Sequence, residues 1–172
     1  MPNAQTHDII TVVSATGANV AYFQAMQSPK PSLAVLFTAT YLFAGYACAG
    51  DLDLDSKEYR RWGPLRVLWW PYRKLVPHRS WISHGLVLGG LVRLCYLAVL
   101  CMLLFWGALS LYAWYTHQSL NTMAITQERW FSVVMLMKAR PLETAALLGG
   151  FILAGTTHSL ADIIFSWFKR RF

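Results

Sequence analysis

The chain has 172 residues and a formal net charge of +7 at pH 7. Hydrophobic residues make up 56% of it and charged residues 13%, against about 45–50% and about 25% in average soluble proteins. This composition excludes a disordered chain and argues against a water-soluble one. The length suits a single membrane domain over residues 1–172 better than two domains.

The apolar segments, taken in chain order, predict four transmembrane helices. A bilayer core about 30 Å thick needs roughly 20 largely apolar helical residues. The first span, residues 9–26, is uncharged but diluted by small polar side chains, which suits a helix packed inside a bundle. Two prolines then predict a short helical-hairpin turn. The other spans are expected over residues 33–50, 85–116 and 142–168. The expected fold is therefore an all-α integral membrane bundle of about four helices.

The connector over residues 51–84 contains much of the positive charge. Seven Lys and Arg residues lie in it, three more follow the last span, and four lie on the other side of the bundle. The positive-inside rule therefore predicts that the connector and both termini are cytoplasmic, in an inner, cytoplasmic-type membrane. The connector's Trp and Tyr residues suit the headgroup layer, so membrane lipid is the expected partner. A basic patch without a reading motif is a weak signal, and no nucleic acid is expected.

Four compact polar clusters interrupt the apolar sequence, at residues 6–8, 51–56, 78–84 and 158–162. Ionisable groups in or beside membrane spans are costly and are by default candidates for functional sites. In the four-span topology all four clusters fall at the cytoplasmic end of the bundle. In the last cluster His158 and Asp162 are four residues apart on a helix, so they project from one face and can bind the same ion.

The residue types in these clusters predict a metal site. Imidazole nitrogens together with carboxylate oxygens suit a divalent transition metal, with zinc favoured over manganese or iron. The proposed ligands suffice for one or two ions; they are His7, Asp51, Asp53, His78, His84, His158 and Asp162. Each cluster alone also has an ordinary interpretation as a helix cap, an interfacial loop or a satisfied polar pair. Their occurrence together favours the metal site.

Several better-known sites do not fit this sequence. The spacing of Asp51, Asp53 and Asp55 is typical of the start of a calcium-binding loop, but Ser56 and Trp62 stand where that loop needs Gly and Glu. The five histidines are too few for the histidine boxes of membrane di-iron oxygenases. Three cysteines without a CxxC pair predict neither a disulfide framework nor a thiolate zinc site.

In chain order, the four clusters resemble the pattern of the YdjM-like inner-membrane proteins, which are predicted membrane-bound metal-dependent hydrolases, and of a related cyanobacterial-type group named only for metal binding. The pattern is an initial Thr-His, an Asp-rich turn, a His-Arg followed by Ser-His, and a final His-x3-Asp. This chain departs from it at Gly50, where a proline is usual, and in one additional residue between Arg79 and Ser83. The resemblance implies a metal site and, more loosely, phosphoester hydrolysis.

The leading interpretation is a membrane-embedded metal-dependent hydrolase acting on a lipid-type phosphoester at the cytoplasmic face, although the sequence leaves open whether the protein is an enzyme. Asp8 or Asp55 would accept a proton or orient a histidine. Arg79 and Arg93 would hold the substrate anion, or Arg93 would neutralise Asp162. The alternative is a non-catalytic metal-binding scaffold or assembly protein. A metal transporter is a third and weaker interpretation.

Overall fold

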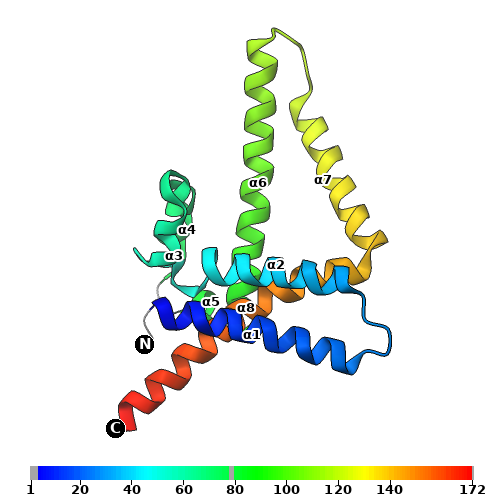
Figure 1. Ribbon diagram of the computed structural model, residues 1–172. Helices are drawn as coiled ribbons and strands as arrows, with labels where there is room; N and C mark the ends of the chain where they lie inside the picture. Colours follow the sequence, from blue (N-terminus) through cyan, green and yellow to red (C-terminus); the bar gives the residue numbers. More distant parts are fainter. Residues whose placement is uncertain (1–3, 78–79, 172) are drawn as a thin grey trace.

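The structure, a computed structural model, describes residues 4–77 and 80–171. Within these residues every regular element is a helix, which confirms the all-α expectation. Three long helices pack against one another, each in contact with the other two, and together are called the helix layer below: α1 (Ala4–Ala25), α2 (Pro31–Ala47) and α8 (Pro141–Arg171) (Figure 1). The prolines between α1 and α2 end one helix and begin the next, as expected.

The other two long helices form a hairpin that leaves this layer steeply (Figure 1). They are α6 (Leu88–Tyr115) and α7 (Thr122–Ala139), joined by a turn in which His117 has a positive φ of 53°. Helix α7 is not among the elements expected from the sequence, because residues 127–129 are polar or charged and interrupt its apolar run. In place of the expected four-helix bundle, the structure has a layer of three helices from which a hairpin of two helices projects.

Three helical segments are long and apolar enough to cross a membrane, namely Pro31–Asp53, Leu88–Tyr115 and Pro141–Arg171. They correspond to the second, third and fourth expected spans. Helix α1 is not among them, so four spans are not confirmed. The length and composition of the three helices support membrane association, while the orientation of the termini stays a prediction.

Glycines allow the helices of the layer to approach one another closely. A Cβ atom added at Gly150 of α8 would lie 2.6 Å from the carbonyl oxygen of Phe37 in α2, and one added at Gly45 of α2 would collide with Thr11 of α1. Non-bonded heavy atoms do not approach so closely. The small residues of α8 therefore let it pack closely against α2, and Gly150 and Ala154 are both buried.

The connector between α2 and α6 folds into short helical pieces. These are η1 (Gly50–Asp53), α3 (Lys57–Arg61), η2 (Gly63–Trp69), α4 (Trp70–Leu75) and α5 (Trp81–His84). Trp69 is fully buried and stacks on Tyr96 of α6, with ring centroids 5.3 Å apart. Tyr72 packs edge-on against both rings. This aromatic cluster holds the connector on α6 and so helps to place the Asp-rich turn that follows α2.

Candidate metal centre

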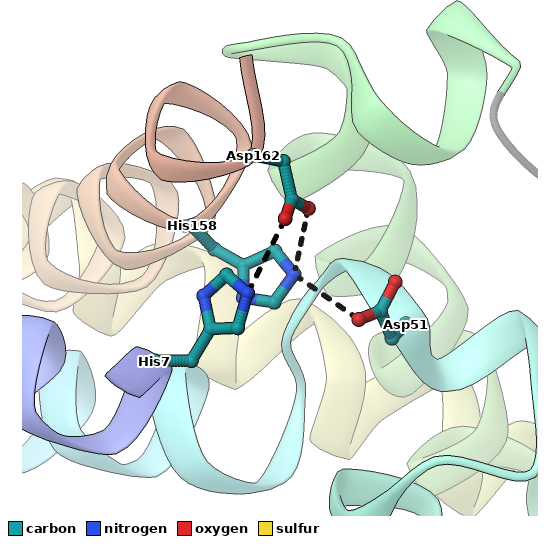
Figure 2. A group of neighbouring side chains, drawn as sticks. All are labelled: His7, Asp51, His158 and Asp162. Carbon is teal, nitrogen blue, oxygen red and sulfur yellow. Dashed lines mark ion pairs between the residues drawn. The ribbon is translucent and has the colours of Figure 1, made fainter. Parts of the chain in front are cut away.

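Four ionisable side chains from three distant parts of the chain meet at one end of the helix layer (Figure 2). They are His7 near the start of α1, Asp51 in η1, and His158 and Asp162 in α8. Each offers one ligand-type atom, and these atoms all lie within 4.8 Å of one another. All four were proposed as ligands from the sequence.

Each imidazole of this cluster faces a carboxylate. His7 Nε2 lies 3.3 Å from Asp162 Oδ1. His158 Nε2 lies 3.5 Å from Asp162 Oδ2 and 3.6 Å from Asp51 Oδ2. The two imidazole rings stack with centroids 4.0 Å apart, so both present a nitrogen to Asp162 (Figure 2).

Burial makes this arrangement costly for side chains alone. His7 and His158 are each 5% exposed and Asp162 is 8% exposed. Both Nε2 atoms and both Asp162 oxygens lack a hydrogen-bond partner within the described part of the chain. A buried polar group left unpaired costs about 1–3 kcal/mol, whereas one divalent cation can coordinate several such atoms together. Two imidazoles and two carboxylates therefore fit a transition-metal ion.

His84 extends the cluster on the other side of Asp51. Its Nε2 atom lies 3.3 Å from Asp51 Oδ1, so the two Asp51 oxygens face different histidines. Ser83 Oγ lies 2.9 Å from His84 Nδ1, and Arg93 Nη1 donates to the Ser83 carbonyl at 2.9 Å. A metal-ligating histidine is usually oriented by a hydrogen bond to its other nitrogen. Ser83, which the sequence interpretation did not assign to the site, supplies such a contact.

Two acidic residues of the Asp-rich turn, Asp53 and Asp55, lie outside the group of four. Asp53, expected as a ligand, is 7% exposed and interacts electrostatically with the buried guanidinium of Arg93. Asp55 is exposed, and its carboxylate lies 2.7 Å from Arg60 Nη2. The hydrogen bond from Arg60 holds the pKa of Asp55 below its usual range. Its proposed catalytic role stays a prediction.

Asp8 follows His7 directly, but its side chain binds two cations of α3. Asp8 Oδ2 lies 2.6 Å from Arg61 Nη2 and 3.1 Å from Lys57 Nζ. Burial of the carboxyl opposes its ionisation, but the hydrogen bonds and charges of Arg61 and Lys57 outweigh this and hold the Asp8 pKa below its usual range. The contact ties the start of α1 to α3 and thereby helps to fix His7.

Of the two proposed anion-binding residues, the structure describes Arg93 alone. His78, a proposed ligand, and Arg79 lie outside the described residues. Arg93 is 1% exposed, with Gly155 leaving the space that its guanidinium occupies. Its described hydrogen bond goes to the Ser83 carbonyl. Arg93 therefore lies behind the site, where it supports the backbone next to His84, and its burial argues against contact with a substrate.

Comparisons with known proteins support metal binding in general terms. A family model described as "Uncharacterized metal-binding protein (DUF2227)" matches residues 2–172. An uncharacterized protein of Aquifex aeolicus (strain VF5) is 42% identical over 62 residues, which cover 36% of this chain and 43% of that protein. The matched region thus spans less than half the length of this relative. No solved structure matches the chain. The resemblance to YdjM-like hydrolases is not confirmed.

Proposed function

The chain belongs to this family of metal-binding proteins, and from that premise we propose that its His/Asp cluster binds a divalent transition metal and hydrolyses a phosphoester at the cytoplasmic membrane face. The cluster is the group of His7, Asp51, His158 and Asp162. The observation that carries the proposal is the burial of His7, His158 and Asp162, whose facing nitrogen and oxygen atoms lack hydrogen-bond partners in the described part of the chain. Nitrogen and oxygen ligands in this proportion favour zinc, with manganese or iron as alternatives, over magnesium or calcium.

A divalent ion held by these four residues would polarise a phosphoryl oxygen and lower the pKa of a bound water from about 15.7 toward about 7. Asp51 is the ligand best placed to give up a coordination position to water, because its side chain is 17% exposed and those of the other three are 4–11% exposed. Asp8, held ionised by its cationic partners, is the proposed proton acceptor or orienting group beside His7.

Positive charge next to the cluster supports a phosphoester as the substrate class. Lys57 and Arg61 both contact Asp8, the neighbour of His7. The Lys57 side chain is about half exposed, so it is accessible to an incoming anion. Lysine and arginine are the usual side-chain partners of phosphate oxygens. We therefore add Lys57 and Arg61 to Arg79 as proposed contacts of the substrate anion.

A non-catalytic metal scaffold is the second candidate function, and the ligand count favours it. Four protein ligands close a tetrahedral ion, whereas a catalytic zinc keeps one position for water. The four residues also come from both ends of the chain, so a bound ion would hold α1, η1 and α8 together. A metal transporter is disfavoured, because the far end of the helix layer holds an apolar groove lined by α1, α2 and α8 and no second group of metal-type ligands is described there.

Metal analysis of the detergent-purified protein tests the ligand assignment. His158→Ala and Asp162→Ala should each remove most of the bound transition metal, because each deletes one of four ligands. His117→Ala is the matched control, since His117 is exposed in the turn between α6 and α7. Full metal content in the His158→Ala, Asp162→Ala double variant would overturn the assignment.

A phosphoester screen on the metal-loaded protein then separates the two functions. In a hydrolase, Asp8→Asn should reduce turnover by about 10²–10⁴-fold while metal content is kept, because proton transfer typically contributes that much. A comparable loss in Asp55→Asn would move the proton-transfer role to Asp55. Absence of turnover on lipid phosphates and nucleotides, with metal coordinated entirely by side chains, would favour the scaffold.

A further inference from the structure

An apolar groove lies between α1, α2 and α8, toward the end of the layer opposite the metal cluster. Its volume is about 510 Å³. Tyr22 and Ala18 line it from α1, Phe37 from α2, and Ala146 and Leu153 from α8. The lining is almost wholly apolar, so the groove offers surface to hydrocarbon and very little to water.

The polar side chains in the groove wall, Asn19 and Tyr22, already have hydrogen-bond partners, and the Tyr22 hydroxyl accepts from the Lys30 backbone N–H at 2.8 Å. Asn19 Nδ2 donates to the Ala15 carbonyl at 2.9 Å and to Thr38 Oγ1 at 2.6 Å. A buried water molecule needs two to four polar partners to be stable. The groove therefore has the character of a dry site that gains free energy when apolar atoms fill it.

The groove and the metal cluster both involve α1 and α8, and Asp51 of the cluster lies in η1, which follows α2. Leu153 precedes His158 by five residues, which is about 7.5 Å along α8. Ala18 follows His7 by eleven residues, which is about 16 Å along α1. One leaflet of a bilayer contributes about 15 Å of hydrocarbon, half of the core. The groove thus lies within one lipid tail's reach of the cluster.

The apolar groove and the metal cluster together suit a molecule that has an apolar chain at one end and an anionic group at the other. Around the groove, Val20, Phe23 and Val35 expose apolar surface, and α2 and α8 are apolar enough to span a membrane. At the other end lie a cation-binding cluster and the cations Lys57 and Arg61. We infer that the groove binds the hydrocarbon chain of an amphiphile whose phosphoester headgroup reaches the metal cluster. This inference rests on the proposed function and narrows its substrate class to lipids with a long chain.

A chain-end photo-crosslinker tests the inference on the full-length, detergent-purified protein. The probe is hexadecyl phosphate with a diazirine at the far end of its chain. We expect it to label peptides of α1 and α8 that line the groove. Excess hexadecyl phosphate should suppress this labelling, whereas inorganic phosphate, which has the same charged group and no chain, should not.

Two neighbouring alanines of α8 provide matched variants. Ala146 lines the groove, whereas Ala145 is exposed and does not line it. Ala146→Phe should reduce labelling about tenfold, because the phenyl ring would occupy space in the groove that the chain otherwise fills, and overpacking an apolar site is unfavourable. Ala145→Phe should label like the wild type. Ala18→Phe fills the groove from α1 and gives a second test, and circular dichroism checks that each variant is folded.

The outcomes separate this inference from the proposed function. Labelling outside the groove, or equal labelling of Ala146→Phe and Ala145→Phe, would overturn the chain site even if phosphoesters are hydrolysed. Groove labelling without turnover would support the chain site and remove the hydrolase. Removing the metal should weaken labelling by the diazirine-bearing hexadecyl phosphate. It should not weaken labelling by hexadecanol that carries the same diazirine but no phosphate. Equal effects on the two probes would overturn the headgroup assignment.

Discussion

Gly50 provides a direct mutational test of the metal cluster, because its missing side chain faces two histidines. A Cβ atom at this position would lie 2.9 Å from His158 Cδ2 and 3.4 Å from His84 Nε2. Non-bonded carbon atoms settle at about 3.5–4.0 Å. In Gly50→Ala the His158 ring must therefore retreat by about 0.6–1.1 Å, which exceeds the ±0.2 Å tolerance of metal–ligand distances.

This displacement should weaken metal binding without unfolding the protein. We expect about a 10–100-fold loss of affinity, the usual cost of disturbing the groups that orient a ligand, which corresponds to about 1.4–2.8 kcal/mol. Gly149→Ala is the control, since a Cβ atom there meets nothing within 4 Å. In the interior of α8 it should stabilise the fold by about 0.5–1 kcal/mol and leave metal affinity unchanged.

Competition with a chelating dye measures the metal affinity of both variants, and thermal unfolding in excess chelator measures their stability without metal. Equal metal affinity in Gly50→Ala and Gly149→Ala would refute the reasoning, because His158 would then bind no ion in the position described. A reduced affinity in Gly50→Ala with an unchanged melting temperature in chelator would support it.

Three further predictions address other parts of the structure. Ser83→Ala should weaken metal binding about 10–100-fold if His84 is a ligand, because the ring loses its orienting contact; dye competition measures this, and unchanged affinity would remove His84 from the ligand set. Asp8→Asn should lower the melting temperature at pH 7, because the folded-state pKa of Asp8 is depressed and its ionised carboxylate stabilises the fold. The wild type keeps this extra stability above the unfolded-state pKa of Asp8 and loses it as the pH falls through the lowered folded-state pKa. Melting temperatures of the two proteins, measured against pH, should therefore converge in acid. Reporter fusions after Phe172 and within residues 117–121 should report opposite sides of the membrane, and the same side for both would end the predicted topology.

The convergence of the four residues could be foreseen from local patterns. Helical spacing places His158 and Asp162 on one face regardless of the rest of the fold. His7 and Asp51 flank the hairpin of α1 and α2, whose proline-bounded turn brings the start of one helix near the end of the other. These are short-range features, and sequence patterns describe short-range features well. Metal binding by these residues remains a prediction.

The direction of α6 and the partners of Asp8 depend on tertiary contacts that no local pattern specifies. A Cβ atom at Gly89 would collide with the Ser83 carbonyl, so the start of α6 packs directly on α5 and leaves the layer from there. The sequence alone does not show which backbone Gly89 meets. Likewise, the sequence contained Lys57 and Arg61 without indicating that both would bind Asp8.

The residues of the metal cluster lie far apart in the sequence, and this determines when the site can form during biosynthesis. His7 and Asp162 are 155 positions apart, and at 5–20 residues per second a ribosome needs roughly 8–30 s to make the second after the first. The nascent chain therefore has no complete site while α1 and α2 are being made. A chain truncated before α8 would retain His7 and Asp51 but lack half of the donors, so metal occupancy would mark proteins whose last helix has been made and docked.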